Sequence, residues 1–466
     1  MMKKSSLSRR DWMKYAALGA FSTAGARALA DFRHHNSPGL ESNGTLYDGT
    51  GAAPARLIDG KVTRPALEVP QISECDVLVV GGGPAGCCAA ISAARAGAKV
   101  TLVERYGHFG GLATGGLVLI ILGHWVTGGP GNAPKQVLAG IGEEMMRRLE
   151  AMPDGIVDRA PGKNPTIDAE VYKYLLVEML TEENIEIFLH SWALDAIVDD
   201  EPDPLTGSPV VRGALFQTKT GPVAVLAKQT IDTTGDGDIF ATAGCAYDRR
   251  LYDIGLVHRL GNLDRANPPK DGSSSPPRHL GDITPIPGVN WVNMGGPVGD
   301  GVDVKTLSRL ELEHRKQIWK QVQEIKKTPG YEKTFLMETA PQIGVRITRV
   351  LQGDETLTID QARAGKHYDD CLGVGGAWNA EHGPWEIPLS VLVSANVENI
   401  LTAGRSLSAD WGMSDVVRVI PNCWVSGHAA GAAAAVAALE GTTARGVNVA
   451  AVQDLLKKQG AYLGEA

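Results

Sequence analysis

Several side chains in the second half of the chain have types that suit proton and charge transfer. His382 lies in a loop between two tryptophans, where an imidazole could take the proton of a substrate hydroxyl as hydride leaves. The plainer alternative is an ordinary surface histidine. Arg346 and Arg349 could clamp a carboxylate or stabilise an anionic ring, or they could form structural ion pairs. Asp415 follows the last predicted strand and could contact a cofactor or a substrate, so we predict His382, Arg346 and Asp415 as catalytic residues.

A glycine-rich turn offers a binding site for a dinucleotide. Residues 81–86 read GGGPAG and have the G-x-G-x-x-G spacing. The first glycine of this pattern permits a tight turn, the second lets the backbone approach a pyrophosphate, and the third lets helix pack on strand. The pyrophosphate then lies at the positive N-terminus of the helix. We therefore predict that Gly81, Gly83, Pro84 and Gly86 bind the cofactor.

The elements around this turn must position it. Residues 75–80 are apolar and β-branched, which predicts a strand buried on both faces. Residues 87–96 predict a helix of small side chains, and residues 99–104 predict a second strand. The second strand ends in Glu104, about 20 residues beyond the turn, where an acid accepts hydrogen bonds from ribose hydroxyls.

A second glycine-rich loop, residues 105–116, favours FAD over NAD. An NAD site has little need of such a loop, whereas a flavin and its ribityl chain extend past the pyrophosphate and need close backbone contact. Two later strand ends have the same character. Residues 229–238 end in DTTGDGD, and residues 399–405 run into a Gly-Arg turn before an Ala/Gly-rich helix at about 423–440.

Four blocks together resemble the FAD-dependent oxidoreductase family, within the glutathione-reductase-like flavoprotein superfamily. They are the GGGPAG turn with its acid, GHFGGLATGG, DTTGDGD, and NILTAGRSLSAD leading to VRVIPNCWVSGHAAGAAAA, and they span most of residues 75–440. The resemblance implies FAD as the cofactor but says little about the substrate. It also implies FAD contacts at the matching positions, which are Gly81, Gly83, Gly86, Glu104, Arg105, Gly110, Gly111, Asp232, Thr234, Gly235, Gly404 and Arg405.

The N-terminus resembles a twin-arginine signal peptide. Arg9 and Arg10 precede an aromatic residue, a methionine and a lysine, and a mildly apolar stretch then leads to the A-x-A-like site at 28–30. Trp12 stands where phenylalanine is commonest. We predict a signal peptide over 1–30, export of the folded chain by the twin-arginine translocase, and a periplasmic or otherwise exported location.

The chain is long enough for two interleaved domains behind this leader. We predict an α/β fold, with a Rossmann-like FAD-binding domain built on a parallel sheet and a second α+β substrate domain. Within the latter, residues 262–300 are rich in Pro, Gly and Ser and predict an irregular loop. The predicted segments are an arm at 31–74, the first part of the FAD-binding domain at 75–245, the substrate domain at 246–395, the C-terminal return of the FAD-binding domain at 396–445 and a tail at 446–466.

Composition excludes some functions. A net charge of −8, without a large basic stretch, argues against nucleic-acid binding. The six cysteines show neither a CxxC motif nor metal-ligand spacing, so we predict no metal site, dithiol centre or disulfide framework.

These features predict an exported flavoprotein oxidoreductase. Hydride would pass between a small organic substrate and N5 of the flavin, and a quinone or cytochrome would serve as electron partner because nicotinamide nucleotides are not expected outside the cytoplasm. The alternative is an FAD-containing lyase or isomerase acting on a saccharide-like substrate with no net redox change. A long loop and an N-terminal arm would also suit a homo-oligomer.

Overall fold

Alternating burial places one strand at the centre of a seven-stranded sheet. β3 (Gln71–Val80) turns Val77 and Val79 into the larger hydrophobic core, and Leu78 and Val80 into a second core on the opposite face, because side chains alternate along a strand. A strand covered on both faces requires a continuous apolar run. The predicted strand is confirmed and is longer than expected.

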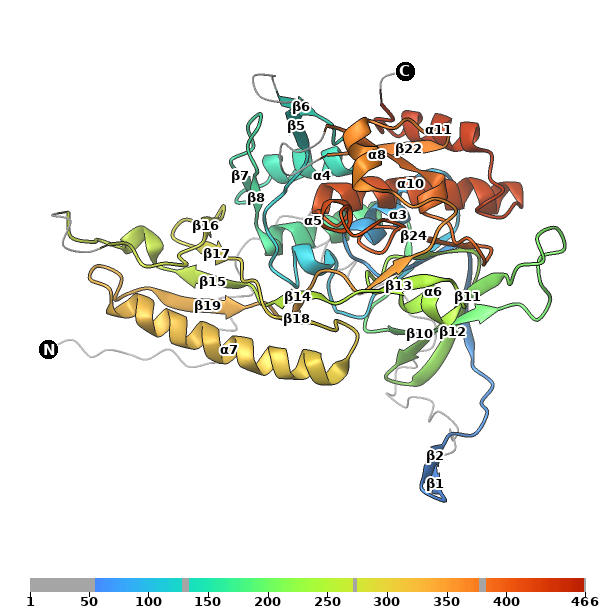
Figure 1. Cartoon of the computed structure of the whole chain (residues 1–466), viewed down its shortest axis with the longest axis horizontal. Coiled ribbons are helices and arrows are strands. Elements are labelled where there is room, and N and C mark those ends of the chain that lie inside the picture. The colour runs from blue at the N-terminus through green and yellow to red at the C-terminus, as the bar shows by residue number, and fades with distance from the viewer. Residues whose placement is uncertain (1–54, 128–133, 271–274, 377–382, 465–466) are drawn as a thin grey trace, which may run out of the picture. The chain divides into compact units, whose positions relative to one another are not determined.

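The sheet has the order β10-β11-β12-β3-β4-β9, and β24 also pairs with β12. β12, β3, β4, β9 and β24 pair in parallel, while β10 and β11 extend the sheet antiparallel. Besides β3, the strands are β4 (Val100–Val103), β9 (Glu186–Phe188), β10 (Trp192–Val198), β11 (Val211–Thr218), β12 (Gly221–Asp232) and β24 (Ile400–Thr402). The predicted α/β class with a Rossmann-like parallel core is confirmed (Figure 1).

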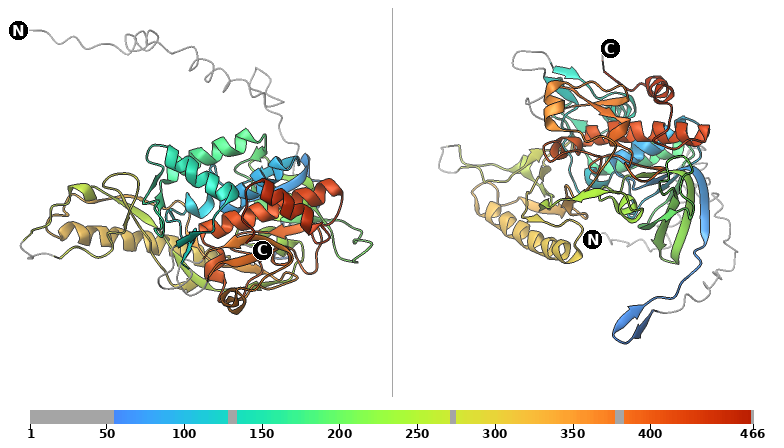
Figure 2. Two further views of the ribbon diagram at one scale, coloured as in Figure 1. Left: turned by 90° about the horizontal axis from the view of Figure 1, so that it is seen from above. Right: turned by 45° about the vertical axis from the view of Figure 1, so that its right-hand side comes forward.

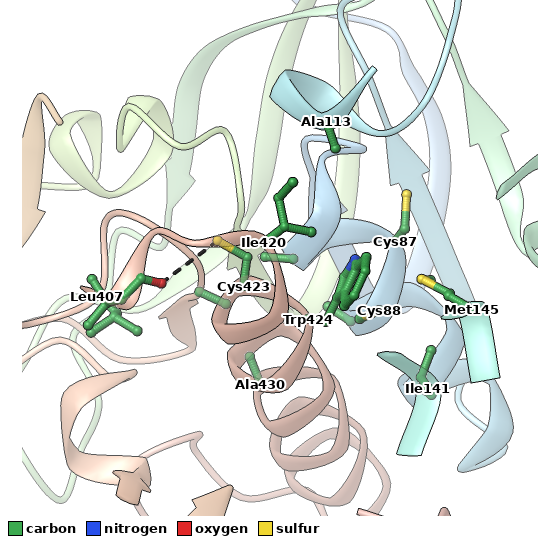
Figure 3. Packing of buried hydrophobic residues seen from close by; sticks show 14 of the residues in the cluster. Cys87, Cys88, Ala113, Ile141, Met145, Leu407, Ile420, Cys423, Trp424 and Ala430 are labelled. Atoms are coloured by element: carbon green, nitrogen blue, oxygen red, sulfur yellow. Dashed lines mark hydrogen bonds between the residues drawn. The ribbon is translucent and has the colours of Figure 1, made fainter. Parts of the chain in front are cut away.

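Two helices of small residues cover one face of this sheet. Gly427 and Gly431 of α10 (Ile420–Glu440) lie against α3 (Pro84–Arg95), so closely that a Cβ on either glycine would overlap a carbonyl oxygen of α3. Figure 2 shows the two helices side by side. Cysteine, methionine and tryptophan side chains fill the surrounding core (Figure 3). The adjacent cysteines of α3 therefore belong to the packing of this core.

The other helices pack against the central sheet, against α3 and α10, or against the small antiparallel sheets. They are α4 (Gly140–Ala151), α5 (Ala169–Glu182), α6 (Asp238–Thr242), α7 (Val304–Lys327), α8 (Ile359–Ala364), α9 (Ser414–Val417) and α11 (Val449–Lys458), with 3₁₀ turns η1 (Gly111–Ala113), η2 (Leu263–Arg265) and η3 (Leu389–Val391).

Small antiparallel sheets complete the fold, and most of their strands come from the stretch of sequence between β12 and β24. Their strands are β5 (Trp125–Thr127), β6 (Pro134–Gln136), β7 (Ile156–Val157), β8 (Thr166–Ile167), β13 (Tyr247–Arg249), β14 (Tyr252–Gly255), β15 (His258–Gly261), β16 (Asp282–Ile283), β17 (Asn290–Val292), β18 (Val298–Gly299), β19 (Phe335–Thr339), β20 (Gly344–Val345), β21 (Arg349–Leu351), β22 (Cys371–Gly375) and β23 (Trp385–Pro388). The prediction of an irregular loop at 262–300 was partly wrong. Three short strands, β16 to β18, lie there because their partners β14, β15 and β17 supply the backbone hydrogen bonds.

The computed structural model describes residues 55–127, 134–270, 275–376 and 383–464. Contacts divide the chain into two units, 1–68 and 69–466. In the first unit, β1 (Arg56–Ile58) and β2 (Lys61–Thr63) form an antiparallel hairpin. The leader lies outside the described residues, and the predicted domain boundaries stay predictions. None of the helices described here has the length and apolar character needed to span a membrane.

Candidate functional site

The first glycine turn has the shape that its sequence predicts. Gly81 has a φ of +105°, which favours glycine, and Gly86 lies so close to the turn that a Cβ would overlap the carbonyl oxygen of Gly81. Gly83 is different. Its Cβ would meet no atom closer than the Cα of Gly111, at 4.0 Å, so open space lies in front of this residue.

The second glycine loop packs directly on the first turn. The N–H of Gly110 donates to the carbonyl oxygen of Gly82 at 2.8 Å. Gly110 and Gly111 have φ values of +98° and +49°, and a Cβ on Gly111 would lie 3.0 Å from the Cα of Gly83. Bare backbone from two loops therefore borders the same open space.

Glu104 ties the two loops together at the end of β4. Its carboxylate accepts from the N–H of Gly82 at 2.6 Å and from the N–H of Tyr106 at 2.8 Å, and its side chain is buried. A carboxylate has about four acceptor positions, so these bonds leave Glu104 able to accept from a ribose hydroxyl as well.

Arg105 lies between two aromatic rings. Its Cζ is 4.9 Å from the ring centroid of Tyr106 and 5.4 Å from that of Trp192, distances typical of cation–π contacts. Trp192 belongs to β10 and was missed by the sequence analysis, because nothing in the local sequence places it beside Arg105.

The DTTGDGD segment folds around its first acid. The fully buried carboxylate of Asp232 accepts from the N–H and the hydroxyl of Thr234 at 3.0 and 2.7 Å, and from the N–H groups of Ile239 and Phe240 at 2.9 and 3.0 Å. Burial raises the pKa of Asp232, although these donors oppose the shift. Cofactor contact by Asp232 stays a prediction. Since all its acceptor positions are in use, the geometry gives the side chain a positioning role in the turn before α6.

This segment joins the first glycine turn to the C-terminal return. The hydroxyl of Thr233 donates to the carbonyl oxygen of Gly81 at 2.7 Å. On the other side, Arg405 donates to Asp236 at 2.9 Å, and a Cβ on Gly235 would lie 2.6 Å from the Nε of Arg405. Gly404, with a φ of +81°, turns the chain out of β24 into this contact.

The predicted catalytic residues fall into three situations. Arg346 forms an ion pair with Asp253, and Arg349 pairs with Asp238 at 3.0 Å, so each arginine has its own acid. Asp415 lies nearby and accepts hydrogen bonds from Tyr252 and Arg418. His382 lies outside the described residues.

The hydroxyl of Tyr252 donates a hydrogen bond to the carboxylate of Asp415. Burial, together with the neighbouring carboxylate, raises the pKa of Tyr252 to about 12. Burial alone would raise the pKa of Asp415, but Arg418 and the Tyr252 hydroxyl outweigh it and lower that pKa. Tyr252 therefore stays protonated and Asp415 stays charged near neutral pH. The sequence analysis missed Tyr252, since its partner is 163 positions away.

Arg346, Asp253, Tyr252 and Asp415 form what we call the charged cluster, and the two glycine loops form what we call the cofactor cradle. Arg405 links the cluster to the DTTGDGD segment beside the cradle. Arg405, which pairs with Asp236, also donates to the carbonyl oxygen of Arg346 at 3.4 Å, and Thr348 donates to Asp236 at 2.9 Å. The structure thus brings together the predicted residues Gly235, Arg405 and Arg346. Within the described part of the chain, no group of three or more His, Cys, Asp or Glu side chains could hold a metal ion.

The site fits the diphosphate of FAD. Open space in front of Gly83 leads to the N-terminus of α3, where no side chain caps the helix. Free N–H groups at a helix N-terminus bind phosphate. The fit is thus made by backbone, as the G-x-G-x-x-G spacing predicts.

Comparison with known proteins agrees with this geometry. A family model described as FAD dependent oxidoreductase matches residues 76–249 and 274–456. The chain is 26% identical over 209 residues to thiamine thiazole synthase of Metallosphaera sedula, covering 42% of this chain and 68% of that protein. It is 29% identical over 187 residues to the same enzyme of Sulfolobus acidocaldarius, covering 40% and 63%. The chain thus spans about two thirds of the length of these relatives.

Two solved structures are similar over most of the chain. A geranylgeranyl bacteriochlorophyll reductase-like protein of Thermoplasma acidophilum is 16% identical, with a TM-score of 0.42, covering 83% of this chain and 82% of that chain. The flavin-dependent brominase Bmp2 is 14% identical, with a TM-score of 0.45, covering 83% of both chains.

Proposed function

Because this chain belongs to the FAD dependent oxidoreductase family, we propose that it transfers hydride between a small organic substrate and N5 of its flavin. FAD as cofactor and the oxidoreductase class follow from the family. The substrate class, the catalytic residues and the electron partner are the proposal. The observation that carries it is the series of contacts from the glycine cradle through Asp236 and Arg405 to Arg346. Arg346 pairs with Asp253, which follows Tyr252 in the chain, and Tyr252 in turn bonds to Asp415.

Each residue of the cluster has a role in this proposal. Bound FAD supplies the site that accepts or returns hydride. Arg346 keeps N–H groups beyond its pair with Asp253, and these can orient a carboxylate or carbonyl of the substrate. Tyr252 is protonated near neutral pH, and its single hydroxyl hydrogen would turn from Asp415 to a substrate oxygen when the substrate binds, donating a hydrogen bond or a proton there. When the substrate is an alcohol, His382 remains the predicted proton acceptor.

The cofactor contacts are part of the same proposal. Gly81, Gly83, Pro84, Gly86, Gly110 and Gly111 would approach the diphosphate through backbone, and Glu104 would accept from the ribose. Thr234, Gly235, Gly404 and Arg405 would border the flavin end. The cradle at Gly83 and the contact between Gly235 and Arg405 support these assignments.

An anaerobic absorbance titration tests the redox assignment. Purified holoenzyme would be mixed in turn with hydroxy acids, sugars and amines, and the visible bands of oxidised flavin would be followed. We expect bleaching by one class, which then names the substrate. Turnover of a substrate with no bleaching and no electron acceptor required would instead support a lyase or isomerase and refute hydride transfer.

We also propose that the chain is exported folded through a twin-arginine signal and that a quinone or cytochrome accepts its electrons. Two further proposals are that the chain belongs to the glutathione-reductase-like superfamily and that it forms a homo-oligomer. The support for export is the sequence around Arg9 and Arg10. Replacing both with lysine (Arg9→Lys with Arg10→Lys) should leave the precursor in the cytoplasm. Normal processing of that variant would refute the signal.

A further inference from the structure

α7 carries a concentration of positive charge in an acidic chain. Over Val304–Lys327 the sequence has seven Lys and Arg and three Glu, whereas the whole chain has a net charge of −8. Each of the three acids is paired with a base on the same helix, in Arg309–Glu313, Arg315–Glu311 and Lys327–Glu324. Among the described residues, no acid lies within ion-pair distance of the four remaining lysines, Lys305, Lys316, Lys320 and Lys326.

The solvent face of α7 also exposes two large apolar side chains. Leu312 is 65% exposed and Trp319 is 58% exposed. Leu312, Lys316 and Lys320 follow one another at intervals of four residues, and Trp319 lies seven residues after Leu312. These helical spacings place all four side chains on one face of α7. The opposite face, with Leu310, packs against the core. Figure 1 shows α7 running alongside β19.

We propose that this face of α7 docks on an anionic lipid surface. Each base near an anionic bilayer strengthens binding by about fivefold. Tryptophan prefers the membrane–water interface, where its ring meets both apolar and polar surroundings. Four unpaired lysines around one exposed Trp and one exposed Leu supply both contributions. A soluble polyanion would use the lysines alone and would leave Trp319 and Leu312 exposed. The combination therefore favours a lipid surface.

The test is co-sedimentation of the full-length holoenzyme with vesicles. One set contains phosphatidylcholine with phosphatidylglycerol, and the other contains phosphatidylcholine alone. We expect binding at least about tenfold stronger to the anionic set, and weaker in high salt. Lys316→Glu with Lys320→Glu should reduce that binding by at least about tenfold, and Trp319→Ser should reduce it by a smaller factor.

Matched controls separate this docking from general effects. Lys163→Glu with Lys219→Glu makes the same charge change at exposed positions in two turns away from α7, and Leu205→Ser removes an exposed apolar side chain elsewhere. Both should bind like the wild type, with unchanged melting temperature and flavin content. Equal binding to both vesicle sets, or equal losses in the control and α7 variants, would overturn the proposal. Two further results would overturn it. If the α7 variants changed only the sedimentation coefficient of the free protein, this face would be a contact between copies of the chain. If they changed only the retention of the protein on heparin, this face would bind a soluble polyanion.

Discussion

The two glycine loops and the charged cluster differ in what makes the contacts. In the loops, backbone atoms approach within a few ångströms of one another, and the space in front of Gly83 stays open because no side chain is present. In the cluster, side chains make the contacts, and several of them join segments far apart in the sequence, as between Tyr252 and Asp415. The first region depends on the absence of side chains and the second on their pairing. Substitutions should therefore separate cofactor binding from chemistry.

The largest effect is expected at the cradle. Gly83→Val would place its Cβ in the open space, 4.0 Å from the Cα of Gly111, so the fold should persist while FAD retention falls by at least about 100-fold. Losing two hydrogen bonds to a charged diphosphate, at about 1.5–3 kcal/mol each, accounts for this factor. Flavin content after purification and circular dichroism give the measurement. Gly86→Val is the contrasting variant and should unfold the protein, since its side chain would overlap Gly81. A yellow, fully loaded Gly83→Val protein would remove the site assignment.

A smaller effect is expected in the charged cluster. Tyr252→Phe should leave FAD bound and lower kcat by about 100-fold, the usual size of a lost proton donor, with little change in KM. Steady-state kinetics with the substrate found by flavin bleaching would measure this. Tyr174→Phe, on the exposed face of α5, is the matched control and should behave like the wild type. An unchanged kcat in Tyr252→Phe would make the cluster structural.

The same pair should be visible in alkaline titration. The ordinary pKa of tyrosine is about 10, whereas that of Tyr252 is raised to about 12 by burial and by Asp415. Because the pKa is raised in the folded state, the hydrogen bond contributes its full share to the free energy of unfolding below about pH 10. That contribution is lost as the pH rises through about 12. Difference absorbance of tyrosinate between wild type and Tyr252→Phe isolates the group. Asp415→Asn should shift its pKa downward, and an unshifted titration would contradict the contact.

The smallest effect is expected at the aromatic contact of the cofactor region. Trp192→Ala removes one of the two rings beside Arg105, and a cation–π contact at a partly exposed site contributes about 0.5–1 kcal/mol. FAD affinity should therefore fall by only about two- to fivefold, as measured by fluorescence titration of the apoprotein. Leu205→Ala should have no effect. A loss as large as that of Gly83→Val would mean that side chains dominate binding here too.

The difference between local backbone turns and long-range side-chain pairs also explains which parts of the site the sequence could predict. The turn at 81–86, both flanking strands and the helix follow from periodicity and fixed glycine spacing, which are local properties. Asp232 was recognised within its motif, but its four hydrogen bonds depend on how the following turn folds. Tyr252 has no local pattern at all, and the two arginines three residues apart proved to face different acids. Residues whose partners come from distant segments cannot be paired before the fold is known.

The burial of the cysteines has a consequence for oxidative chemistry. All six thiols are free and enclosed, and burial raises the pKa of each. Only the thiolate attacks oxidants and disulfides, so the cysteines can be modified only after the fold opens. The rate of reaction with a thiol reagent would therefore measure the rate or extent of that opening. A chain that entered an oxidising compartment unfolded would expose six reactive sulfurs with about fifteen ways to pair them fully. A chain that arrived already folded would present no exposed thiol to the oxidants.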